Sequence, residues 1–255
     1  MSNTITIWRK ELQSYFRSPI AYGVLAFFSL ITGYFFYVGV VYFVRASVQS
    51  SMMGQSQPMS VNESVVRPLL GNISVIGLFL IPMITMRLFA EEKRSGTIEL
   101  LITSPVKDLA IIMGKWLAAL TLYASMLGLS LFSMATLFFY GKPDLRPIMT
   151  GYLGLLLLGG SLLAIGTFIS TCTKNQIVAG VAGFSVCLLL WVLDWMSSFQ
   201  DSVAGKILSY ISVLQHFDSF AKGVIDSRDV VYYLSAIFIG LFLTARSLES
   251  LRWRA

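Results

Sequence analysis

Charged side chains are scarce in this sequence of 255 residues. Asp, Glu, Lys and Arg make up 13% of it, against roughly 25% in an ordinary soluble domain. Hydrophobic residues make up 56%, and they gather in runs of about 20 residues or more, the length that a helix needs to cross a hydrocarbon core of ~30 Å. The composition therefore excludes an ordinary soluble globular protein and predicts an all-α integral membrane protein.

Cysteine and histidine are also scarce. The two cysteines, Cys172 and Cys187, lie in or beside apolar runs, so no disulfide framework is expected. The single histidine, His216, has no cluster of cysteines or carboxylates at ligand spacing, so we expect neither a metal site nor a haem site. We interpret His216 as a boundary residue that packs on the outer ends of the helices.

A nucleotide-binding loop is missing as well. A P-loop needs Gly, four residues and then Gly-Lys-Ser/Thr, but the Gly-Lys pairs at 114–115, 141–142 and 205–206 are followed by Trp, Pro and Ile. The apolar runs are nearly free of ionisable residues away from their ends, which argues against proton relays and catalysis at membrane depth. We expect no catalytic residue, no bound cofactor and no nucleic-acid partner.

Six transmembrane helices are predicted from the apolar runs. They cover about residues 20–44, 69–89, 109–140, 148–172, 177–195 and 230–245. The first run is longer than the core of a signal peptide, so we expect it to be retained. Pro82 is expected to kink the second span or to mark its inner end.

An amphipathic helix is predicted over residues 2–18. Its apolar residues recur at helical spacing and its charged residues lie largely between them. The apolar set is Ile5, Trp8, Leu12, Tyr15 and Phe16, and the basic set is Arg9, Lys10 and Arg17. A segment of this kind before a first span is typical of a helix on the inner leaflet, which makes Trp8, Arg9 and Lys10 candidate interfacial residues.

The distribution of basic residues predicts the orientation. With six spans and both ends on one side, that side holds 12 of the 19 Lys and Arg residues. These are Arg9, Lys10, Arg17, Arg87, Lys93, Arg94, Lys107, Lys115, Lys174, Arg246, Arg252 and Arg254. Both termini are therefore expected to be cytoplasmic. Residues 196–229 then form an outer insert, in which short helices near 207–214 and 217–225 are expected to dip into the membrane face.

The densest charge run, EEKRSGTIELLITSP, covers residues 91–105 between the second and third spans. Gly96 allows a sharp change of direction, and Thr97 can cap a short helix that Pro105 ends. On that helix Ile98, Leu101 and Ile102 share one face. One interpretation is a charged loop that only fixes topology, and the other is an amphipathic docking element.

The string EEKRSGTIELLITSPV closely resembles the loop between the second and third spans of ABC-2 type transporter permeases. The resemblance covers essentially the whole chain, including the N-terminal amphipathic helix, six spans, the short second inner loop TCTKNQ and the outer insert. The outer string HFDSFAKGVIDSRDVVYYL (216–234) is most similar to permeases of the gliding-motility-associated and copper-enzyme-maturation branches.

The resemblance implies a permease subunit of an exporter in the bacterial cytoplasmic (inner) membrane. Two permeases, identical or paralogous, would pair in the bilayer, and each would receive a cytoplasmic P-loop ATPase that binds ATP and Mg, so this chain would not be an enzyme. Residues 91–105 would be the coupling loop. The positions carried over are Glu91, Glu92, Gly96, Thr97 and Glu99, whose carboxylates would meet basic groups of the ATPase.

Two other functions stay open from the sequence. A mechanotransmitter of the same fold would pass ATP-driven motion to a periplasmic or membrane accessory partner through the outer insert. A carrier or an intramembrane enzyme would work without ATP, and the pair that an enzyme would need, Ser161 and His216, has no motif behind it. The composition of the spans does not identify a substrate.

Overall fold

The computed structural model describes residues 3–52, 60–99, 106–141, 143–197 and 210–252. Within these ranges the chain is helical and contains no strand. The elements are α1 (Asn3–Arg17), α2 (Pro19–Met52), the π-helical turn η1 (Asn62–Val66), α3 (Arg67–Thr85), α4 (Ala90–Ser95), α6 (Asp108–Tyr140), α7 (Leu145–Cys172), α8 (Gln176–Ser197), α10 (Val213–Ala221) and α11 (Ser227–Arg252).

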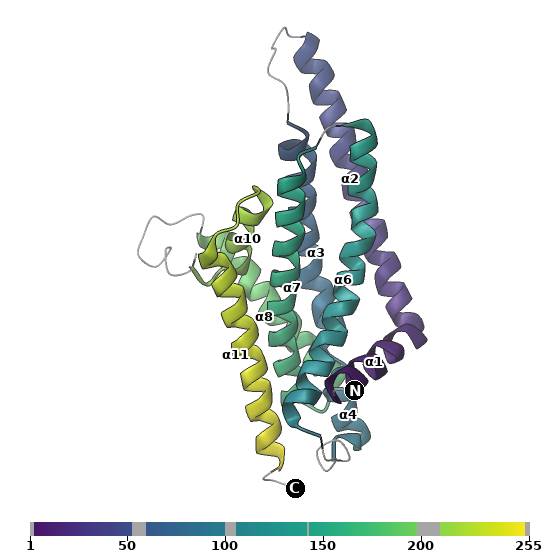
Figure 1. Ribbon diagram of the computed structural model, residues 1–255, viewed down its shortest axis with the longest axis vertical. Coiled ribbons are helices and arrows are strands. Elements are labelled where there is room, and N and C mark those ends of the chain that lie inside the picture. The colour runs from purple at the N-terminus through teal and green to yellow at the C-terminus, as the bar shows by residue number, and fades with distance from the viewer. Residues whose placement is uncertain (1–2, 53–59, 100–105, 142, 198–209, 253–255) are drawn as a thin grey trace.

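Six stretches of the described chain are long and apolar enough to cross a membrane. They are α2, the continuous stretch from η1 through α4, and α6, α7, α8 and α11. The prediction of an all-α fold with six membrane-spanning helices is confirmed. Figure 1 shows them as one elongated bundle, with α1, α4 and the end of α11 together at one end, which we call the base.

Several helix ends differ from their predicted positions. Helix α2 continues to Met52, past the predicted end at residue 44, because the polar segment after it holds no glycine or proline until Gly54. Helix α11 likewise continues beyond residue 245. The second span is interrupted soon after Pro82, where α3 gives way to a turn after Thr85.

The outer insert holds one described helix, and its position differs from both of the predicted ones. Helix α10 begins after Ser212, whose side chain accepts a hydrogen bond from the backbone of Gln215. It ends before Gly223, which has a φ of +88°. The left-handed conformation of this glycine stops a helix that had been expected to run to residue 225. Of the other expected helix, at 207–214, residues 207–209 lie outside the described residues, residues 210 and 211 are helical, and Ser212 separates them from α10.

Helix α7 is the centre of the bundle and packs against α3, α6, α8, α10 and α11 (Figure 1). Its glycines let the neighbouring helices approach closely. A Cβ atom on Gly159 would lie 2.1 Å from the ring of Tyr123, and one on Gly166 would lie 2.4 Å from Thr85 Oγ1. The indole N–H of Trp116 donates to the Gly160 carbonyl at 3.1 Å. Side chains of α3 and α6 thus contact the backbone of α7 directly.

The outer helices α2, α8 and α11 bury only a small part of their apolar length. Large side chains on them, such as Leu30, Tyr37 and Phe238, are exposed. Apolar surface of this extent is stable only when lipid or another apolar chain covers it. The three helices therefore supply the surfaces that face the bilayer or a second subunit.

We predict that Gly159→Ala destabilises the bundle, because its methyl group must displace the buried Tyr123 ring. The overpacking cost is about 1–3 kcal/mol, and it would be measured as a lower melting temperature of the detergent-purified protein by tryptophan fluorescence. Gly128→Ala is the matched control, since a Cβ atom there meets nothing within 4 Å. Equal melting temperatures for the two variants would contradict the packing described here.

Candidate functional site

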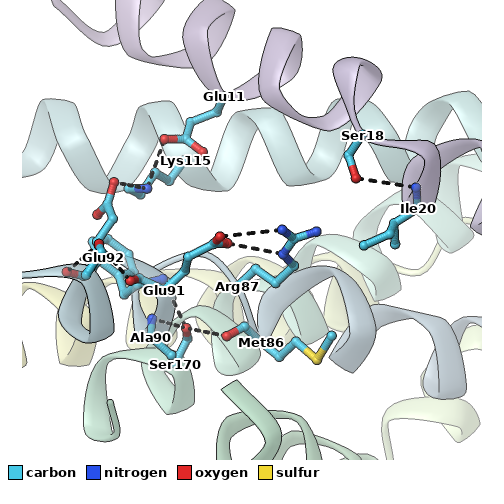
Figure 2. Close-up of polar contacts among 12 residues, drawn as sticks. Glu11, Ser18, Ile20, Met86, Arg87, Ala90, Glu91, Glu92, Lys115 and Ser170 are labelled. Atoms are coloured by element: carbon cyan, nitrogen blue, oxygen red, sulfur yellow. Dashed lines mark hydrogen bonds and ion pairs between the residues drawn. The ribbon is translucent and has the colours of Figure 1, made fainter. Parts of the chain in front are cut away.

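The charge run after the second span folds as a short helix, α4, whose first turn is held by another helix. The backbone N–H groups of Phe89 and Ala90 each donate to the Ser170 hydroxyl oxygen at 3.1 Å (Figure 2). Ser170 is fully buried on α7. Helices leave their first N–H groups without partners in the helix itself. Ser170 accepts two of these groups and so fixes the start of α4 on α7.

A second contact joins α4 to α7. The Lys93 ammonium donates to the carbonyl oxygen of Thr171, one residue before α7 ends. Carbonyl groups in the last turn of a helix have no partner within the helix, and a cation there is also favoured by the helix dipole. The charged helix is therefore attached to α7 through both its backbone and a side chain.

A buried cation joins α4 to two further helices. The Lys115 ammonium on α6 lies 3.0 Å from Glu11 Oε1 on α1 and 2.9 Å from Glu92 Oε1 on α4 (Figure 2). The Lys115 side chain is 2% exposed, and it also lies over the ring of Phe89. We call Glu11, Lys115 and Glu92 the base triad.

The burial of Lys115 decides how these helices are held. An unpaired ammonium in the protein interior costs several kcal/mol, so it stays charged only with carboxylates close to it. Glu11 and Glu92 are themselves largely buried, and Glu92 Oε2 has no hydrogen-bond partner within the described part of the chain. Moving α1 or α4 away from α6 would leave one of these charges without its partner.

Helix α1 lies directly on α6 beside the triad. A Cβ atom on Gly114 would come within 2.8 Å of the Ile7 side chain, so only glycine allows this close approach. The Trp8 indole N–H donates to Thr121 Oγ1 at 3.0 Å. The three candidate interfacial residues therefore differ in their surroundings. Trp8 contacts α6, whereas Arg9 and Lys10 are exposed. Ile5, placed on the apolar face by the sequence pattern, is exposed as well.

A second ion pair spans the turn between α3 and α4. Arg87 Nε lies 3.1 Å from Glu91 Oε2, in an i, i+4 arrangement, and both side chains are partly exposed (Figure 2). An exposed pair of this kind contributes ~0.2–1 kcal/mol. It stabilises the turn but leaves Glu91 accessible from outside.

The remaining coupling-loop positions follow α4. Gly96 has a φ of +72° and ends the helix, which is the change of direction predicted from the sequence. Residues 97–99 are helical again. The Thr97 hydroxyl lies 2.8 Å from Ser95 Oγ, and Glu99 is exposed. Ile98 is buried, and the other members of its predicted face, with Pro105, lie outside the described residues.

The structure changes the expectation for Glu92. The sequence analysis grouped Glu92 with Glu91 and Glu99 as carboxylates for a basic partner. Glu92 points instead into the protein, toward Lys115, whereas the other two are exposed. Adjacent residues of a helix point about 100° apart, so Glu91 and Glu92 cannot share one exposed face.

Glu11, Lys115 and Ser170 were not recognised as site residues from the sequence. Lys115 entered only the search for a P-loop and the count of basic residues on the inner side, although it interrupts the apolar string AIIMGKWLAALTLY. A lone cation inside such a run is a signal for a buried ion pair. Ser170 had no comparable signal, because a serine in an apolar helix is common and its partners lie on another span.

At the opposite end of α11, His216 packs against the aromatic ring of Tyr232 with ring centroids 4.0 Å apart. Its Nδ1 is 2.7 Å from Asp229 Oδ1 and its Nε2 is 3.0 Å from the Tyr210 carbonyl oxygen. Both partners are hydrogen-bond acceptors. The Ser161 hydroxyl donates to the Leu158 carbonyl within α7. No hydrogen bond pairs Ser161 with His216 in the described chain.

Asp218 connects α10 to α3 at this end. Its carboxylate contacts Arg67 and Lys222, each at 2.6 Å. Burial alone would raise the pKa of Asp218, but hydrogen bonds from Lys222 and Arg67 outweigh it and lower the pKa. No group of three or more His, Cys, Asp or Glu residues in the described chain could hold a metal ion.

Comparison with known proteins gives one family. A family model described as ABC-2 family transporter protein matches residues 5–245. This range includes nearly all of α1, the α4 segment, the first five membrane-spanning stretches and most of the sixth. No curated protein matches the chain.

We predict that Lys115→Met lowers the melting temperature strongly, because two largely buried carboxylates lose their cation. Removing one member of a buried ion pair costs about 3–5 kcal/mol. The triple variant Glu11→Gln, Lys115→Met, Glu92→Gln should recover much of this loss, since it leaves no buried charge. An unchanged melting temperature in Lys115→Met alone would show that the triad does not hold the helices.

Ser170→Ala is expected to destabilise α4 by ~0.5–2 kcal/mol, the usual cost of losing a helix cap. Proteolysis of the intact protein should then cut the segment after α3 faster than in the parent. Ser185→Ala is the control, because Ser185 is exposed on α8 and donates only within its own helix. The cap assignment fails if both variants are cut at the parental rate.

Proposed function

Because the match over nearly its whole length shows that the chain belongs to the ABC-2 family of transporter proteins, we propose that it is the permease subunit of an export complex. Separate cytoplasmic ATPase subunits drive this complex. The chain itself is a multi-pass membrane component. ATP and Mg bind to the partner ATPase, whose P-loop this sequence does not contain.

The observation that carries the proposal is the attachment of α4 to three other helices. Ser170 and Lys93 join α4 to α7, and Lys115 joins it to α6 and to Glu11 on α1. A force applied to α4 therefore acts on the ends of two spans and on α1 together. A segment that only fixed topology would need no such attachment.

The exposed residues of the same segment suit contact with the ATPase. Glu91, Gly96, Thr97 and Glu99 are exposed at the base, and the two carboxylates carry a charge that basic groups of a partner can meet. Glu92 has the complementary role, because it passes the displacement of α4 to Lys115. The coupling loop thus has an outer side that receives the ATPase and an inner side that moves the spans.

The base lies in the cytoplasm in this proposal, since most Lys and Arg residues belong to that side, and the membrane is the bacterial inner membrane. A second permease, identical or paralogous, pairs with the chain through the apolar surfaces of the outer helices. Membership of the gliding-motility-associated or copper-enzyme-maturation branch, and a periplasmic accessory partner, stay predictions of the resemblance.

Glu99→Lys should weaken recovery of the ATPase and ATP-driven transport more than Glu99→Ala does. The alanine variant removes one exposed charge interaction of ~0.2–1 kcal/mol, whereas the lysine adds repulsion from basic groups of the partner. The measurement is the amount of ATPase that copurifies with the tagged chain from native membranes, together with ATP hydrolysis by the assembly.

Glu249→Lys provides the matched control, because Glu249 is also an exposed carboxylate but lies on α11, where it pairs with Arg246. It should leave ATPase recovery unchanged. Equal effects of the lysine changes at residues 99 and 249 would refute the docking assignment. Isolation of the chain alone, active without ATP, would refute the ABC function itself.

A further inference from the structure

A partly open cavity lies at the base, next to the triad, with about 620 Å³ of space when the solvent at its mouth is included. Its walls come from α1, α2, α3, α4 and α6. Figure 2 shows Glu11, Arg87, Glu91 and Ser18 around this region of the molecule. The cavity lies where α1 meets the start of the first span, and it shares Glu11 with the base triad and Glu91 with the coupling loop.

The polar part of the cavity carries both signs of charge. Glu11 and Glu91 contribute carboxylates and Arg87 contributes a guanidinium. Arg87 donates hydrogen bonds to Glu91 from Nε and from one Nη atom. Because a guanidinium has five N–H groups, Arg87 can bind a second anion as well. The Ser18 hydroxyl oxygen accepts from the backbone of Ile20, which leaves its O–H free to donate.

The lining has one more carboxylate than cation. Burial, and next the nearby Glu11 carboxylate, raise the pKa of the Tyr15 phenol well above its ordinary value, so Tyr15 stays neutral and adds no charge. A purely anionic ligand would meet Glu11 and Glu91 unfavourably. A ligand with both a phosphate and an ammonium group would satisfy the guanidinium and the carboxylates together.

The apolar part of the cavity lies deeper along the spans. Ala21 and Val24 line it from α2, Ile84 from α3 and Leu122 from α6. Arg87 and Glu91 follow Ile84 in the chain toward the base. The cavity thus changes from polar to apolar in the same direction as a lipid leaflet does, from headgroup to acyl chain.

We propose that this cavity binds phosphatidylethanolamine from the leaflet at the base, with the phosphate on Arg87 and Ser18 and the ammonium on Glu11 and Glu91. A primary ammonium has three N–H groups to donate. The quaternary ammonium of phosphatidylcholine has none, and sites for it are built from aromatic rings, of which this cavity has only Tyr15. Through Glu11 the bound lipid touches the base triad.

Native mass spectrometry of the full chain, purified in mild detergent without its partners, tests this proposal. Phosphatidylethanolamine, phosphatidylglycerol and phosphatidylcholine with the same acyl chains would be added at equal concentrations. We expect phosphatidylethanolamine to be retained about tenfold better than either, the difference made by one hydrogen bond to a charged group. Equal retention of the three lipids would overturn the proposal.

Three variants locate the site. Arg87→Gln should lower retention of phosphatidylethanolamine about tenfold, and Ala21→Leu should lower it by filling the apolar part. Glu91→Gln should shift the preference toward phosphatidylglycerol, which a merely structural role of Glu91 would not do. Arg94→Gln is the matched control, because Arg94 is exposed on α4 and does not line the cavity.

Comparable losses in Arg87→Gln and Arg94→Gln would overturn the assignment, as would an unchanged preference in Glu91→Gln.

A competition experiment distinguishes the whole lipid from its headgroup. Soluble phosphoethanolamine in excess should not displace the lipid, since the acyl chains add apolar contacts. Displacement would show that the site binds the headgroup alone, and would overturn the proposal that its ligand is a lipid. The experiment needs no ATPase, so its failure would leave the proposed function untouched.

Discussion

The charge of Lys115 is the constraint on which the base of this bundle depends. An ammonium in an apolar helix is stable only when carboxylates reach it, and here the two carboxylates come from α1 and α4. The same residue therefore fixes the helix that precedes the first span and the helix that follows the second. The geometry of the base is set by one buried cation and not by the many exposed charges around it.

The centre of the bundle depends on a different kind of contact. Glycines of α7 let Tyr123 and Thr85 approach its backbone closely, and Ser170, further along α7, accepts the first N–H groups of α4. Packing against α7 and pairing with Lys115 thus act on the same short helix from two sides. A helix held in this way is expected to move together with the spans to which it is attached, which the proposed coupling to a cytoplasmic ATPase requires.

Much of the fold could be predicted because the bilayer leaves few alternatives. Apolar runs of sufficient length must be helices there, since every backbone polar group needs a partner within the chain. The end of α10 was predicted less well, because it depends on the left-handed conformation of Gly223. Gly96 was predicted correctly from its residue type, whereas Glu92 was assigned to the wrong side because its direction depends on the phase of α4.

The sequence alone showed that this is a membrane protein, how many spans it has and which family it belongs to. These three conclusions follow from the composition, from the length of the apolar runs and from the motif of the charged loop. Only the tertiary structure decided which charged residues are internal and which are available to a partner. Glu11, Lys115 and Ser170 are far apart in the chain, and their roles follow from the distances between helices. Those distances arise only when α1, α6 and α7 pack together, so they cannot be read from local sequence.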